Sequence, residues 1–150
     1  MAALDVRFDQ VFQLSVTPTI AAKHFANRAT IRANAVDTEK TEEVEDNGIR
    51  WFLTRHEALG VSHQGVYTCR YELLGNRVRW WTDGAGNMLS EGTATFFPSQ
   101  HGTSMRYEHR LTIELPIGRL ALIALTPIAT PIARRGISKY VEKMISSLHS

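Results

Sequence analysis

Two tight-turn dipeptides, each flanked by stretches of extended character, restrict the fold of this chain more than any other feature of its sequence. Asn47-Gly48 and Gly75-Asn76 are the dipeptides, and both favour short hairpins because their residues tolerate positive φ. A two-residue period also runs from Met105 to Leu115, where apolar or aromatic side chains fill most odd positions. That period is typical of a strand with one covered face. An antiparallel sheet is therefore predicted for the middle of the chain.

The first hairpin is expected to pair strands of about Thr38 to Glu45 and Ile49 to Ala58. A two-residue turn at 47–48 would set Val44 opposite Trp51 and Glu45 opposite Arg50, so that apolar meets apolar and charge meets counter-charge.

The second hairpin is expected to join Tyr67–Leu74 to Arg77–Thr82. This pairing sets Tyr71 opposite Trp80 and Cys69 opposite Thr82, with charged residues on the other face.

Two further turns, "DGAGN" and "PSQHG", lead into the strands Met88–Phe97 and Met105–Leu115. Alternation predicts that His109 lies on the covered face of the last strand. The covered face of the preceding strand is predicted to hold Met88, Ser90, Gly92, Ala94 and Phe96.

Helical patterns lie on both sides of these strands. After a first strand between about Arg7 and Val16, Thr17 can cap a helix and Pro18 suits its first turn; "RATIRANA" continues as a second short helix. A long amphipathic helix is predicted near the C-terminus, where apolar residues recur at i, i+3 and i+4. These residues are Ile137, Tyr140, Val141, Met144, Ile145 and Leu148.

Length and composition indicate a single domain over residues 1–150, since this length can close one hydrophobic core. The net charge of +2 arises from 17 Lys and Arg against 15 Asp and Glu, so a nucleic-acid partner is not indicated. One cysteine, Cys69, cannot form an internal disulfide, and the start of the chain does not resemble a secretory signal. A cytoplasmic location is expected.

The most apolar window is Ile117–Ala133, which contains Pro127 and Pro131. It is shorter than the about 20 residues that a membrane-spanning helix needs. Its part from Leu120 to Ala133 is expected to close over a cavity or to touch a membrane surface.

Three stretches carry a resemblance to a known group of proteins: "VFQLSVTPTIAAKHFAN", "GTATFFPSQHGTSMRYEHRLTI" and "PIARRGISKYVEKMISSL". With the order of elements, they make nearly the whole chain similar to the START-like helix-grip superfamily (SRPBCC), which includes polyketide cyclases, plant pathogenesis-related proteins and coenzyme Q-binding proteins. The resemblance implies an α+β fold in which a strongly curved seven-stranded antiparallel sheet wraps around a long C-terminal helix, with two short helices after the first strand.

The covered face of this sheet combines aromatic, small and polar side chains, which indicates a cavity rather than a filled core. If the odd positions from Trp51 to Glu57 point inward, Arg55 and Glu57 do so too; the alternative is an ion pair at the end of the sheet. His109 either makes a structural hydrogen bond or contacts ligand. The predicted ligand-binding residues are Trp51, Leu53, Arg55, Tyr67, Tyr71, Trp80, Ser90, Met105, Tyr107 and His109.

Three functions compete at this point. The first is a carrier or sensor of a hydrophobic small molecule such as a lipid, an isoprenoid quinone or a polyketide-like aromatic. The second is a cyclase, aromatase or dehydratase in which His109 transfers protons and Tyr71 or Arg55 polarises a carbonyl. The third is ribosome association, which the nearly balanced charge supports little.

No cofactor is expected, and no metal site is predicted because His56 and His63 have no third ligand at a recognisable spacing. Cys69 is interpreted as a buried core residue rather than a nucleophile.

Overall fold

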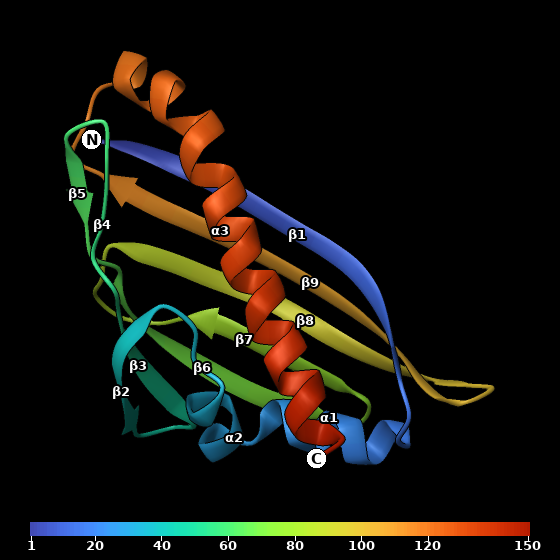
Figure 1. Cartoon of the computed structure of the whole chain (residues 1–150). Helices are drawn as coiled ribbons and strands as arrows, with labels where there is room; N and C mark the ends of the chain where they lie inside the picture. Colours follow the sequence, from blue (N-terminus) through green and yellow to red (C-terminus); the bar gives the residue numbers. More distant parts are fainter.

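The main sheet in the computed structural model, which describes residues 1–150, has seven antiparallel strands and curves around one long helix (Figure 1). Because the first strand pairs with the last, the two ends of the strand region meet in the sheet. The strand order is β1 (Ala2–Leu14), β9 (Gly102–Leu115), β8 (Met88–Ser99), β7 (Arg77–Thr82), β6 (Val66–Leu74), β3 (Gly48–Leu53) and β2 (Thr38–Val44).

A separate two-stranded sheet lies between β3 and β6 along the chain. It is formed by β4 (His56–Ala58) and β5 (Val61–His63). The prediction of one strand from Ile49 to Ala58 was therefore wrong. The chain leaves the main sheet after Leu53, where the β2–β3 ladder ends at the pair of Thr38 and Leu53.

The two predicted hairpins have different outcomes. Between β6 and β7 the register is as predicted, with Tyr71 opposite Trp80 and Cys69 opposite Thr82. Between β2 and β3 the predicted register was wrong: Val44 pairs with Gly48, and Trp51 lies opposite Thr41. Arg50 still faces a glutamate, but this residue is Glu42 rather than Glu45.

The difference arises at Gly48, which belongs to strand β3 and not to the turn. Positive φ occurs instead at Asp46 and Asn47, at 58° and 57°. Gly48 is buried, and a Cβ there would come within 2.5 Å of the side chains of Val44 and Arg70. The glycine thus permits a close approach by neighbouring side chains.

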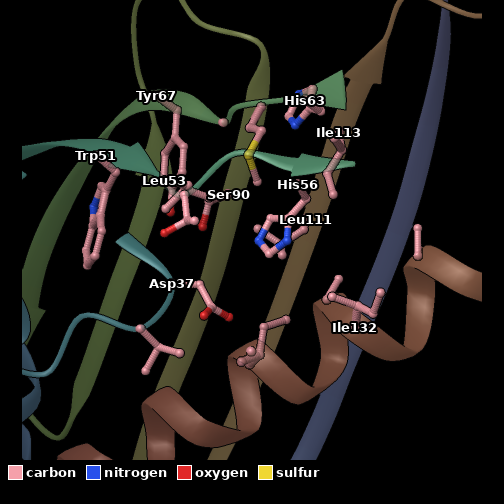
Figure 2. Close-up of a pocket in the computed structure, with 18 of the residues that line it drawn as sticks. Asp37, Trp51, Leu53, His56, His63, Tyr67, Ser90, Leu111, Ile113 and Ile132 are labelled. Atoms are coloured by element: carbon pink, nitrogen blue, oxygen red, sulfur yellow. The ribbon is translucent and has the colours of Figure 1, made fainter. Parts of the chain in front are cut away.

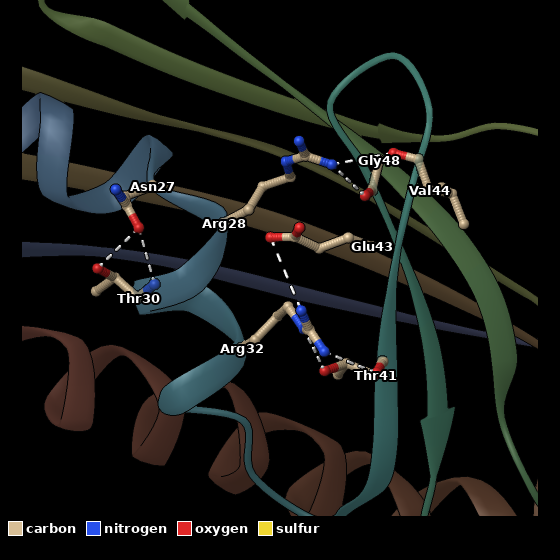
Figure 3. Close-up of polar contacts among 8 residues, drawn as sticks. All are labelled: Asn27, Arg28, Thr30, Arg32, Thr41, Glu43, Val44 and Gly48. Carbon is tan, nitrogen blue, oxygen red and sulfur yellow. Dashed lines mark hydrogen bonds and ion pairs between the residues drawn. The ribbon is translucent and has the colours of Figure 1, made fainter.

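Both predicted short helices are present. Helix α1 (Pro18–Ala26) begins after the Thr17 cap, and α2 (Arg28–Ala33) begins after Asn27, whose side chain accepts from Thr30 N. Helix α2 binds the edge hairpin (Figure 3). Arg28 Nη1 donates to the carbonyls of Val44 and Gly48 at 3.0 and 3.2 Å, and Arg32 donates to Thr41. These bonds tie α2 to both strands of the edge hairpin.

The C-terminal helix α3 (Arg119–Leu148) has 30 residues and continues through Pro127 and Pro131. Each proline removes one backbone hydrogen bond. Both prolines are exposed, so the freed carbonyls can bond with water. The helix therefore includes the apolar window from Arg119 onward as well as the predicted amphipathic part.

Helix α3 crosses the concave face of the sheet (Figure 1). Its C-terminal part is fixed by His24, whose Nε2 lies 2.8 Å from the carbonyl of Met144, and by Asn34, which donates to Ser147. Ile137, Val141 and Met144 are buried there. By length and composition alone α3 could cross a membrane, which for a single helix is weak evidence.

Candidate functional site

A cavity of about 280 Å³ lies between the concave face of the sheet and α3. Hydrophobic residues are 21 of the 31 that line it. In Figure 2, Trp51 and Tyr67 project from sheet strands on one side, and Ile132 of α3 lies on the other. The lining is thus apolar with a small number of polar groups, as in most small-molecule sites.

Strand alternation places the polar groups at the sheet side of the cavity. On β9, Tyr107 and His109 face inward between apolar neighbours, and on β8 Ser90 does the same. The predicted faces of β8 and β9 are therefore confirmed: Met88, Ser90, Ala94 and Phe96 are buried, as are Met105, Tyr107, Leu111 and Leu115.

The imidazole of His109 is held on three sides. Its Nε2 lies 2.8 Å from Ser90 Oγ, its Nδ1 lies 3.3 Å from the hydroxyl of Tyr107, and its ring meets Trp80 edge-on at 5.4 Å. Burial lowers the pKa of His109 to about 4, because the charged form would lose its hydration. His109 is therefore a neutral, fixed group at neutral pH.

Aromatic side chains form the wall next to β3. Trp51 stacks on Tyr67 with ring centroids 6.3 Å apart, and its indole N–H donates to the hydroxyl of Tyr71 at 3.3 Å. Burial raises the pKa values of Tyr67, Tyr71 and Tyr107. These phenols stay protonated and can both donate and accept hydrogen bonds.

The open side of the cavity is marked by exposed lining residues, including Asp37, His56 and Glu57. Asp37 takes a φ of 51°, and Figure 2 shows its carboxylate between the sheet and α3. The carboxylate lies 4.0 Å from where a Cβ on Gly136 would stand. This acidic group has no signal in the sequence that would associate it with the covered face.

The structure brings eight of the ten sequence-predicted site residues together around the cavity: Trp51, Leu53, Tyr67, Tyr71, Trp80, Ser90, Tyr107 and His109. Met105 is buried in the core but does not line the cavity. Arg55 is exposed outside it and donates to Ser62 Oγ at 3.0 Å. Its predicted inward direction was wrong because β3 ends at Leu53. Glu57 lines the cavity only at the exposed mouth.

His56 and His63 lie directly opposite each other across β4 and β5, a proximity that their separation in the sequence did not indicate. Burial and the nearby His56 and Arg55 lower the pKa of His63, whose Nε2 is buried without a hydrogen-bond partner. No third ligand accompanies the pair, since no group of three His, Cys, Asp or Glu side chains could hold a metal ion.

Cys69 is buried beside the carbonyl of Ser90, and burial raises the pKa of its thiol to about 12. A thiol of this kind is a poor nucleophile at neutral pH.

Sequence reasoning did not select several residues that the structure places on the cavity wall. Tyr140 belongs to the apolar stripe of the C-terminal helix. Its position in that stripe was the signal that could have indicated that it faces the cavity. Further lining residues of this kind are Leu4 and Phe25. The lining also includes Leu125, Ala129, Ile132 and Ala133, which lie in the segment from Leu120 to Ala133 that was expected to close over a cavity or to touch a membrane surface.

The curved antiparallel sheet, the two short helices after β1 and the long C-terminal helix over the cavity form a helix-grip fold, as the resemblance of the sequence implied. The sequence matches no family model and no curated protein.

Solved structures with low sequence identity share the fold over nearly the full length. TTHA0849 from Thermus thermophilus is 17% identical, with 97% of each chain covered and a TM-score of 0.68. The KanY protein is 13% identical, with 100% of both chains covered and a TM-score of 0.68. A point mutant of norcoclaurine synthase from Thalictrum flavum, in complex with a transition-state analogue, is 8% identical; 100% of this chain and 99% of that chain are covered, with a TM-score of 0.62.

Proposed function

We propose that residues 1–150 form one ligand-binding domain that holds a hydrophobic small molecule between the sheet and α3, as a carrier or sensor in the cytoplasm. The observation that carries this proposal is the apolar cavity with Ser90, His109 and the tyrosines at one side. Such a combination of apolar walls and a few oriented polar groups is how small-ligand sites are commonly built.

The volume of the cavity favours one of the three ligand classes. Ligand pockets usually measure about 300–1,000 Å³, and this cavity lies near the lower limit at about 280 Å³. An aromatic compound of one or two rings fits such a volume better than an entire lipid or isoprenoid quinone. The stacked Trp51 and Tyr67 and the indole of Trp80 offer ring faces to such a compound.

Native mass spectrometry of freshly purified protein, followed by organic extraction, tests this function. A co-purified aromatic compound, quinone or lipid of defined mass would support it and would name the class. If only apoprotein is found and a panel of small aromatic compounds fails to bind in calorimetry, the proposal is wrong.

A second candidate is an enzyme of the cyclase or aromatase kind that uses the same cavity. The observation in its favour is the chain of hydrogen bonds from His109 to Ser90 and Tyr107, which can pass a proton between a hydroxyl and the imidazole beside bound substrate. The lowered pKa of His109 makes the imidazole a weak base, which ranks this candidate second. Tyr71 faces the same space, whereas Arg55 lies outside it. Replacement of His109 by Gln would then abolish turnover and keep binding; equal loss of both would favour the binding function.

Contact with a membrane surface is proposed for the apolar part of α3. Leu120 and Ile123 are 84% and 69% exposed, respectively, on the part of the helix that precedes the cavity wall. A protein that exchanges apolar ligands with a bilayer would use such a surface.

A further inference from the structure

The interior of the cavity carries no ionised side chain. Among the 31 lining residues there is no lysine and no arginine, and the acidic ones are Asp37 and Glu57. Both of these are exposed at the mouth. Any ligand that enters therefore passes two carboxylates and His56 at the mouth and then meets no lysine or arginine.

The titratable groups deeper inside are all uncharged at neutral pH. Burial lowers the pKa values of His109 and His63 and raises those of Tyr67, Tyr71, Tyr107 and Tyr140. Neither a cation nor an anion is thus available to pair with a charge on the ligand.

The hydrogen-bonding groups inside can still adapt to a neutral partner. His109 contacts the hydroxyls of Ser90 and Tyr107, and each hydroxyl can either donate or accept. Because the proton of the imidazole can lie on either nitrogen, a rotation of these hydroxyls presents either a donor or an acceptor to the cavity.

We infer that the cavity selects an uncharged aromatic ligand with a hydroxyl or carbonyl oxygen, hydrogen-bonded at the Ser90–His109 pair, and excludes carboxylates. This inference rests on the proposed function, because it specifies the ligand of the same cavity. A carboxylate would lose its hydration without gaining a counter-ion, which is costly in an apolar site. A neutral carbonyl of the same shape would lose much less and gain a hydrogen bond.

Three probes of similar shape separate these contributions: 2-acetonaphthone, 2-naphthoate and 2-ethylnaphthalene, measured by calorimetry or by quenching of tryptophan fluorescence at pH 7. The ketone and the carboxylate differ chiefly in charge. We expect 2-naphthoate to bind on the order of 100-fold more weakly than 2-acetonaphthone, since the burial of an unpaired charge costs several kcal/mol. A ratio below about tenfold overturns the exclusion of carboxylates.

The variant Ser90→Ala tests where the oxygen binds. It should lower the affinity for 2-acetonaphthone by about fivefold, the effect of one hydrogen bond, and leave the affinity for 2-ethylnaphthalene unchanged. Ser62→Ala is the matched control, because Ser62 lies on β5 outside this cavity, and it should change neither affinity. If Ser90→Ala lowers the affinity for both probes equally, or lowers neither affinity, the ligand oxygen does not bind at the Ser90–His109 pair.

The wild-type comparison of ketone and carboxylate needs no variant, so it decides the charge selection even if Ser90→Ala does not fold. If all three probes fail to bind, both the inference and the proposed aromatic-binding function are wrong. If 2-ethylnaphthalene binds but charge and Ser90 have no effect, the proposed function stands and the inference alone fails.

Discussion

Trp80 and Gly92 lie opposite each other on β7 and β8, and the indole covers the α-carbon of the glycine. A Cβ at position 92 would come within 2.5 Å of Trp80 Cζ2 and would also contact the carbonyl of Glu108. Because Trp80 lines the cavity and meets His109 edge-on, this glycine determines where one wall of the cavity stands.

The variant Gly92→Ala should displace both the indole of Trp80 and the backbone of β9 at Glu108. We expect a loss of about 1–3 kcal/mol in the free energy of unfolding, as in other overpacked cores, together with weaker ligand binding. Urea denaturation and calorimetry measure the two effects. Gly118→Ala is the control, since a Cβ there meets nothing within 4 Å; equal behaviour of the two variants would contradict the role of Gly92.

The pH dependence of stability should include a contribution from His109. The folded-state pKa is about 4 and the reference value 6.5, so the unfolded chain binds the proton more readily. Stability is therefore intact above pH 6.5 and is lost as pH falls toward 4, by up to about 3 kcal/mol. Urea denaturation between pH 7 and pH 4.5 should show a smaller loss in His109→Gln than in the wild type. Parallel curves would refute this contribution.

Liposome association should depend on the exposed apolar part of α3. The double variant Leu120→Ser, Ile123→Ser should reduce the partition coefficient by about tenfold, because less apolar surface can enter the bilayer. Leu125 is unsuitable for this test, since it is 4% exposed and lines the cavity.

The matched control replaces Leu73 and Leu74, which are 40% and 58% exposed on β6. If the two double variants sediment with liposomes to the same extent, α3 has no special part in membrane contact.

Arg28 should contribute measurably to the stability of the edge hairpin. Its guanidinium bridges the carbonyls of Val44 and Gly48, and Arg28→Ala would remove two charge-assisted bonds. We expect the free energy of unfolding to fall by about 1–3 kcal/mol and the turn at 45–47 to become more sensitive to protease. Arg77→Ala, at an exposed arginine on β7, should change little. A similar loss in both variants would show that general charge, not the bridge, is responsible.

The sequence was sufficient to predict the register of a strand pair where side-chain alternation and turn chemistry agree. In β6 and β7, Gly75-Asn76 lies directly between two alternating stretches, so a slip would expose a whole apolar face. In β2, charged residues occupy both faces of "TEKTEEV", so the pattern has no preferred register. There the register depends on the approach of Arg70 and Arg28 to the hairpin, which are contacts between distant segments.

The candidate site was predicted in part for the same reason. The faces of β8 and β9 follow from alternation, and with them the position of Ser90, Tyr107 and His109. Arg55 was placed inward because the alternation was extended past Leu53, where the β2–β3 ladder ends at the pair of Thr38 and Leu53. Where a ladder ends depends on the fold and not on local composition.

The pairing of β1 with β9 has a consequence for how the chain reaches its native state. Ala2 pairs with Leu115 and Leu14 with Thr103, so the segment between Leu14 and Thr103, which holds the other strands of the sheet, forms a loop that must close before this ladder exists. Folding rates fall as contacts become more distant along the sequence, and closing so long a loop has an entropic cost. During synthesis, the first strand leaves the ribosome with unpaired backbone groups. These groups have no partner in the sheet until β9, its last strand, has been translated.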